Sequence, residues 1–115
     1  MSHPSRKETI RHFTDALNEN HLVKLEKYLD HNVQKTLDSQ IVYKDLKEAH
    51  DYYTQEHANI NASHWKVLNY HDNNQPMNTI KATVTHNGKI YNTIYTFSEA
   101  EKIQHIQATL DADKH

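Results

Sequence analysis

The sequence has no cysteine, a single glycine and only two prolines in 115 residues. Without cysteine there is no disulfide, no thiol nucleophile and no thiolate ligand for a metal. One glycine cannot build a GxGxxG or a GxxxxGKS loop, which excludes nucleotide binding through a glycine-rich phosphate loop. Long apolar runs are missing as well, in the N-terminal MSHPSRKETIRHF and elsewhere. We therefore expect no signal peptide, no membrane span and a cytoplasmic location.

An excess of one charge is also missing. The net charge is -2 and no basic face stands out, so we expect no nucleic-acid partner. The chain has 11 histidines, but none stands in an HExxH or His-x-His pattern. His50 and His57 lie two helical turns apart, too far to chelate one ion by themselves. We therefore expect no metal and no cofactor.

The length and the apolar content indicate one small domain over residues 1–115, with frayed ends at 1–4 and 112–115. The hydrophobic fraction of 36% is low, so the core must be compact and helped by aromatic side chains. Seven of those aromatics are tyrosines, which can serve as an apolar wall and a polar tip at once.

The first half of the chain predicts helices. A capping box at Ser5–Glu8 begins a helix that continues to about Leu17 with apolar residues at helical spacing. A second helix is expected over 20–30, capped by Asn20. Asp45 is placed to cap a third helix over 46–60, which follows a short, irregular strand or edge piece within 32–43.

The second half changes to an alternating period. The runs SHWKVLNYH (63–71), TIKATVTH (79–86), KIYNTIYTF (89–97) and KIQHIQATL (102–110) predict four strands joined by short links. Helices first and strands afterwards, in one small domain, indicate an α+β fold with the helices packed on an antiparallel sheet.

The Asn87-Gly88 pair predicts a two-residue hairpin turn that fixes strand register. Val84 then lies opposite Tyr91, and Ile80 opposite Tyr95. One face of this hairpin, which we expect to be buried, presents Ile80, Ala82, Val84, Tyr91, Thr93, Tyr95 and Phe97. Because hydroxyl groups stand among apolar side chains there, the interior could be partly open to a ligand; the alternative is a filled core with the hydroxyls bonded to backbone or water.

Three segments resemble the nuclear transport factor 2-like superfamily, which includes SnoaL-like polyketide cyclases and ketosteroid isomerases. They are FTDALNENHLVKLEKYLDHNV (13–33), DLKEAHDYYTQEH (45–57) and NGKIYNTIYTFSEAEKIQHIQATLD (87–111). The resemblance implies a cone-shaped, cystatin-like α+β fold, in which a curved sheet wraps around a pocket, and often a homodimer formed through the sheet. It leaves the activity open, because the superfamily holds enzymes and proteins without catalysis.

A ketosteroid-isomerase-like site would place a catalytic carboxylate after the second helix, and Asp38 is the candidate there. The acidic-Pro pair usual at that place is missing from KTLDSQ, and the alternative is that Asp38 caps a surface turn beside Ser39. Tyr53 and Tyr95 could donate hydrogen bonds to an enolate oxygen, or could simply fill the core. On the closing strands, where SnoaL-like cyclases hold an acid or base, His105 is expected to face outward.

We expect a ligand pocket between the third helix and the sheet, suited to a small apolar or aromatic molecule. Its predicted lining is Phe13, Leu17, Tyr53, His57, Trp65, Tyr91, Tyr95 and Phe97. The leading interpretation is a small-molecule-binding domain in which catalysis is unproven. The alternatives are a cofactor-free acid-base enzyme using Asp38, Tyr53 and Tyr95, and a homodimeric interaction module that pairs through the outer face carrying Ile90, Ile94 and Thr96.

Overall fold

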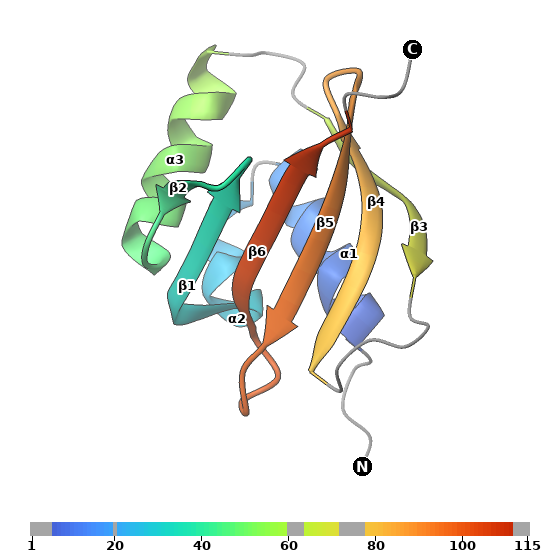
Figure 1. The fold of residues 1–115 in the computed structure, drawn as a ribbon. Coiled ribbons are helices and arrows are strands. Elements are labelled where there is room, and N and C mark those ends of the chain that lie inside the picture. The colour runs from blue at the N-terminus through green and yellow to red at the C-terminus, as the bar shows by residue number, and fades with distance from the viewer. Residues whose placement is uncertain (1–5, 20, 60–63, 72–77, 112–115) are drawn as a thin grey trace.

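The computed structural model describes residues 6–19, 21–59, 64–71 and 78–111, with the backbone alone for 57–59. Helices come first and most strands follow (Figure 1). The elements are α1 (Arg6–Asn18), the 3-10 turn η1 (Leu22–Lys24), α2 (Leu25–Tyr28), β1 (Leu29–Leu37), β2 (Gln40–Tyr43), α3 (Leu46–Asn59), β3 (Trp65–His71), β4 (Thr79–His86), β5 (Lys89–Phe97) and β6 (Ile103–Leu110). The predicted α+β class is confirmed.

Helices α1 and α3 begin close to where the sequence places them. In α1 the apolar positions spaced by one turn, Ile10, Phe13 and Leu17, form the buried face. At the start of α3 the Asp45 carboxylate accepts a hydrogen bond from the Glu48 N–H at 2.8 Å, as an N-cap does. Ser5 and Asn20, the other two predicted caps, lie outside the described residues.

The second predicted helix ends earlier than expected. It was expected over 20–30, but α2 stops at Tyr28, and Leu29 has the extended angles φ -108° and ψ 138°. Leu29 is the first residue of β1, where it pairs with Ile103 of β6. Pairing with a distant strand therefore overrides the helical spacing of Leu22, Leu25 and Leu29.

Residues 32–43 belong to two strands, β1 and the edge strand β2, so the expectation of a single irregular strand or edge piece there is wrong. The chain turns at Asp38 and Ser39, whose φ angles of 50° and 72° lie in the left-handed region. These residues lack the glycine that marks such turns in sequence. Long-range bonds hold the turn instead: the Asp38 N–H donates to the Ala108 carbonyl at 2.9 Å, and the Asp38 carboxylate accepts from the Leu110 N–H at 3.0 Å.

The sheet has six strands in the order β2-β1-β6-β5-β4-β3, one more than the five strands that the sequence predicts. Its neighbours are antiparallel except β1 and β6, which run parallel. The predicted register of the β4–β5 hairpin is confirmed, since Val84 pairs with Tyr91 and Ile80 with Tyr95. Gly88 has a φ of 83° at the turn, the conformation for which glycine is needed.

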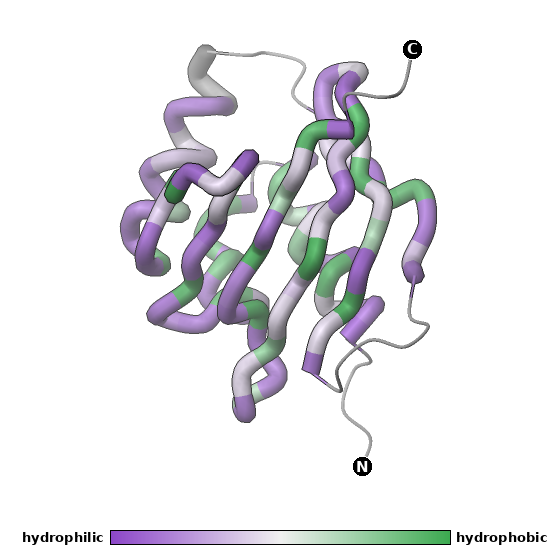
Figure 2. The backbone as a smooth tube through the Cα atoms, in the orientation of Figure 1, coloured by the Kyte–Doolittle hydropathy of each residue, from purple (hydrophilic) through white to green (hydrophobic). Residues whose placement is uncertain are grey.

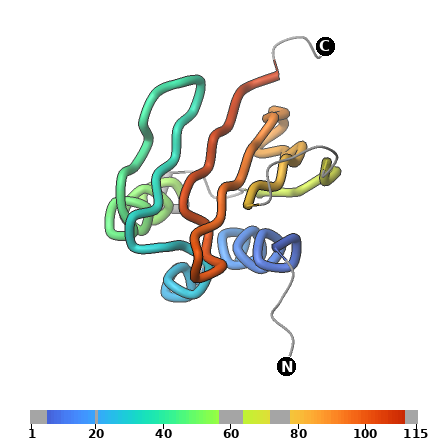
Figure 3. Tube along the Cα trace, turned by 60° about the horizontal axis from the view of Figure 1, so that its bottom comes forward, coloured from blue at the N-terminus to red at the C-terminus, as the bar shows by residue number. Residues whose placement is uncertain are grey.

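The helices lie on one face of the sheet, and the other face is uncovered by helix (Figures 1 and 3). Hydrophobic and hydrophilic residues alternate along the central strands, as a half-covered sheet requires (Figure 2). The predicted inner face of β4 and β5 is buried at Ile80, Ala82, Val84, Thr93, Tyr95 and Phe97 and half-buried at Tyr91. Ile106 and Ala108 of β6 continue it. No helix among the described residues is long and apolar enough to cross a membrane.

Candidate functional site

A cavity of about 50 Å³ lies between the inner sheet face and the helices α1 and α3. Its wall includes six of the residues that the sequence places there: Phe13, Leu17, Tyr53, Trp65, Tyr91 and Tyr95. Phe97 is buried beside the Arg6 guanidinium, which lies 5.6 Å from its ring centroid, and does not line the cavity. The side chain of His57 lies outside the described residues.

The cavity wall contains a lysine that sequence reasoning missed. Lys35 pairs with Tyr43 of β2 and Ile106 of β6, points to the inner face and is only 5% exposed. Its Nζ lies 4.6 Å from the Trp65 ring centroid, 5.8 Å from that of Tyr53 and 5.9 Å from that of Tyr52. The ammonium is therefore surrounded by ring faces, an arrangement that cation–π attraction stabilises. The alternation of Val33, Lys35 and Leu37 on one face was the available signal.

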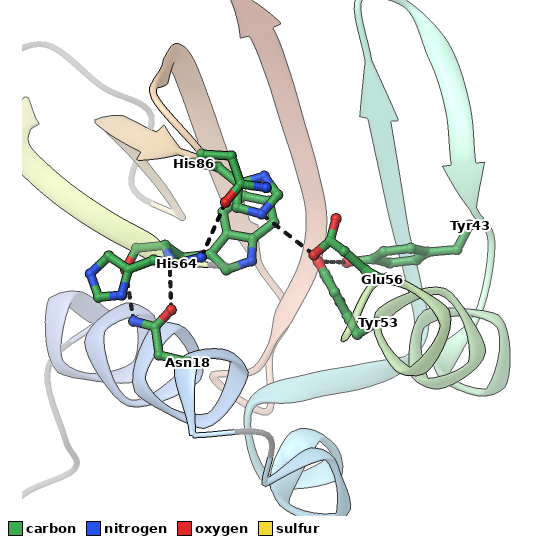
Figure 4. A network of polar contacts seen from close by, with 8 residues as sticks. Asn18, Tyr43, Tyr53, Glu56, His64 and His86 are labelled. Atoms are coloured by element: carbon green, nitrogen blue, oxygen red, sulfur yellow. Dashed lines mark hydrogen bonds and ion pairs between the residues drawn. The ribbon is translucent and has the colours of Figure 1, made fainter. Parts of the chain in front are cut away.

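Burial sets the electrostatics of this lysine. Loss of solvation lowers the pKa of Lys35 to about 8, against an opposing effect of the Glu56 carboxylate. Glu56 comes from α3, and its Oε1 lies 3.6 Å from Nε2 of His86 on β4 (Figure 4). Both side chains are nearly buried, at 11% and 10% exposed. The site thus joins an amine, a carboxylate and an imidazole from three different elements.

The Glu56–His86 pair could also have been located by spacing. Glu56 follows Tyr53 by three residues on α3, and His86 continues the inward positions of β4 after Val84. The His86 ring stacks on Trp65 with centroids 3.6 Å apart and planes 8° from parallel. Packing of this kind fixes both rings at the cavity wall.

The backbone of Trp65 is fixed by hydrogen bonds, whereas its indole N–H makes none among the described residues. The Asn18 side chain bonds both the N–H and the carbonyl of Trp65, each at 2.7 Å (Figure 4). The indole Nε1 is buried with no hydrogen-bond partner in the part of the chain that the structure describes. An unsatisfied buried donor is uncommon in a folded protein and is destabilising unless something satisfies it.

The tyrosines near the cavity are neutral hydrogen-bonding groups. The hydroxyls of Tyr43 and Tyr53 lie 2.9 Å apart and buried, with either able to donate (Figure 4). Burial raises the pKa of Tyr53 well above its ordinary value, that of Tyr95 likewise, and that of Tyr52 to about 12. These three side chains therefore keep their protons near neutral pH and can act as donors.

Asp38 does not reach this site. It is exposed in the β1–β2 turn, and its carboxylate accepts the Leu110 N–H instead of lining the cavity. The interpretation of Asp38 as a general base loses its geometric support, and the surface-turn alternative describes its position. His105 is half-buried and outside the cavity lining, and burial lowers its pKa. The described residues contain no cluster of three or more His, Asp or Glu side chains able to hold a metal ion.

No family model matches the chain, and no curated protein matches its sequence. Several solved structures, however, have a similar fold. A SnoaL-like protein of unknown function from Burkholderia thailandensis superposes with a TM-score of 0.79 at 10% identity, covering 93% of this chain and 94% of that one. A SnoaL-like polyketide cyclase from Agrobacterium tumefaciens gives 0.75 at 16% identity, with 96% and 94% covered.

A cystatin-fold protein from Novosphingobium aromaticivorans gives a TM-score of 0.76 at 12% identity, with 92% of this chain and 98% of that one covered. Structural similarity at identities this low shows the fold alone, so the activity depends on the particular residues of this chain. The chain has the α+β fold of the SnoaL-like, nuclear transport factor 2-like proteins, as its sequence resemblance implied.

Proposed function

We propose that this domain binds a small organic molecule in the cavity between α1, α3 and the sheet. The observation that carries the proposal is a pair of polar groups at an apolar wall: the Lys35 ammonium, which lies over the Trp65 ring, and the buried indole N–H of Trp65, which has no hydrogen-bond partner among the described residues. A core built only for stability would have apolar groups at these positions, because burying polar groups lowers the free energy of unfolding. A ligand atom that accepts hydrogen bonds would satisfy both groups.

The cavity limits the size of this molecule. A dry cavity of about 150 Å³ is known to hold benzene, so about 50 Å³ has room for a group of a few heavy atoms. A larger planar ligand requires the four-carbon stem of Lys35 to withdraw. The chemistry favoured by the wall is an apolar or aromatic body carrying one oxygen acceptor, with Trp65, Tyr53 and Tyr52 as flat contact surfaces.

Ligand-induced stabilisation tests this proposal. Thermal unfolding and Trp65 fluorescence are recorded with a graded panel from small alcohols and ketones to phenol and indole. A ligand at 100 times its dissociation constant raises the free energy of unfolding by about 2.7 kcal/mol. Ala108→Leu fills the cavity wall and abolishes that gain, whereas Gln107→Leu, on the opposite face of β6, retains it. Equal shifts in both variants, or no shift in the native protein, contradict cavity binding.

A second candidate concerns assembly. The sheet face opposite the helices carries Ile90 and Ile94, both half-buried, and Ile90 lies beside Leu68, which is 44% exposed. We propose this face as the surface through which the domain forms a homodimer. Sedimentation equilibrium of the native protein and of Ile94→Lys tests it: a native dimer that dissociates in the variant supports the face, and a native monomer contradicts it.

A further inference from the structure

We propose that Lys35 is a carbonyl-reactive amine, and that the cavity takes a small aldehyde or ketone whose carbonyl carbon Lys35 Nζ joins as an imine. The inference rests on the proposed function, because the carbonyl compound must enter the same cavity. It goes further by naming the chemical class of the ligand and a covalent step.

The position of Nζ carries the argument. Lysine amines become nucleophilic when they are desolvated in an apolar pocket, and Lys35 is 5% exposed on the wall of a cavity. The ring faces of Trp65, Tyr53 and Tyr52 surround the nitrogen. A protonated imine has the same charge as the ammonium, so the same rings stabilise the product as well as the resting state.

The fraction of free amine is the second argument. Only the neutral amine attacks a carbonyl group. With a pKa of about 8, roughly a tenth of Lys35 is neutral at pH 7. An ordinary lysine with a pKa of 10.5 is neutral to only about 0.03% at that pH, so Lys35 has roughly 300 times more of the reactive form.

Two elements other than β1 supply the groups to which we assign proton transfer. Glu56 on α3 acts on Lys35 electrostatically, and it is in contact with His86 of β4. The other titratable groups around the cavity are tyrosines of α3 and β5, which stay neutral. The Glu56–His86 pair is therefore the route by which protons reach and leave the reacting atoms.

The step is balanced without a redox partner. The nitrogen lone pair forms a C–N bond as the carbonyl π electrons move to oxygen, which takes a proton while the nitrogen gives one up. The resulting carbinolamine loses its hydroxyl group as water after a second protonation, and the C–N double bond forms. The sum is amine plus carbonyl giving imine plus water. Hydrolysis by the reverse path regenerates Lys35.

Reductive trapping tests the inference. The native protein is exposed briefly at pH 7 to propanal and cyanoborohydride, and peptides are mapped by mass spectrometry. We expect Lys35 to gain a propyl group at least tenfold faster than Lys66, an exposed lysine on β3. Lys35→Met removes the fast adduct and Lys66→Met does not. Loss of the Glu56 carboxylate lowers the pKa of Lys35 further and by itself would speed its trapping. We nevertheless expect Glu56→Gln to slow the trapping of Lys35 and leave that of Lys66 unchanged, because the proton-transfer group is lost; faster trapping of Lys35 in this variant contradicts that role.

The comparison of the two lysines within the native protein needs no variant to fold. If Lys35 is trapped no faster than Lys66, the carbonyl chemistry is wrong. The thermal-unfolding assay then distinguishes a failure of imine formation alone from a failure of ligand binding in the cavity. Stabilisation by 1-propanol that Ala108→Leu abolishes leaves the ligand-binding proposal standing, whereas its absence removes both. Protection of Lys35 from propanal by 1-propanol supports both.

Discussion

Replacing Lys35 by methionine should change how the stability of the protein depends on pH. Methionine is similarly long and unbranched, so it fills much of the same space without a charge. The buried ammonium is disfavoured by desolvation, and removal of a buried charge in favour of an apolar side chain often stabilises a protein. The quantity to measure is therefore how the difference in free energy of unfolding between the native protein and Lys35→Met depends on pH.

The magnitude follows from the pKa of Lys35. Folding lowers it from 10.5 to about 8, and each unit corresponds to about 1.36 kcal/mol. The folded state is therefore destabilised by about 3 kcal/mol below pH 8, where both folded and unfolded lysine are protonated. As pH rises from 8 towards 10.5, the unfolded chain holds more protons than the folded one, so the stability of the native protein increases with pH. By pH 10 the remaining penalty is about 1 kcal/mol.

Urea unfolding at pH 7, 8, 9 and 10 measures this effect. The native protein should gain about 2 kcal/mol relative to Lys35→Met between pH 7 and 10. The buried Tyr43, Tyr53 and Tyr95 act in the opposite direction above about pH 10, because the unfolded tyrosines ionise first, but they are present in both proteins and cancel. Lys66→Met serves as an exposed control with a flat difference. If the difference in free energy of unfolding between the native protein and Lys35→Met also stays constant with pH, the reasoning about burial of Lys35 is refuted.

Two further substitutions test features that hold the cavity wall and the hairpin. Tyr43→Phe removes the buried partner of the Tyr53 hydroxyl, so it should lower the free energy of unfolding by about 1–3 kcal/mol in urea, against less than about 1 kcal/mol for Tyr70→Phe, whose hydroxyl bond is exposed. Gly88→Ala should cost about 1 kcal/mol by the same assay, since an added Cβ meets nothing within 4 Å and only the φ of 83° is unfavourable; an unchanged stability would show that the turn tolerates alanine.

The parts of the fold that the sequence predicted correctly depend on local signals. The Asn87-Gly88 turn fixed the β4–β5 register, and with it the inward positions of both strands, because side chains alternate strictly along a strand. Asp45 could be identified as an N-cap because a capping side chain bonds an amide only a few residues away. Tyr91 and Tyr95 of the cavity wall followed from the hairpin and Tyr53 from the helix that Asp45 begins, whereas Phe13, Leu17 and Trp65 followed from the apolar spacing of their own segments.

The charged residues of the site stand at inward positions that a search for apolar side chains does not detect. Lys35, Glu56 and His86 each occupy a position in the inward pattern of its own element. Polar residues at such positions read as interruptions of a core, and the sequence gives no measure of how deeply each is buried. The three residues come together only because β1, α3 and β4, which are far apart in the sequence, pack around one cavity.

The sequence by itself determined the α+β class, the central hairpin and an aromatic inner face, since each follows from spacing within a short segment. Only the tertiary structure decided that β1 runs parallel to β6, that Asp38 turns at the surface and that Lys35 lies among three aromatic rings. Each of these depends on contacts between residues far apart in the chain. Burial and the pKa values that follow from it are properties of the enclosed cavity, which exists only when sheet and helices come together.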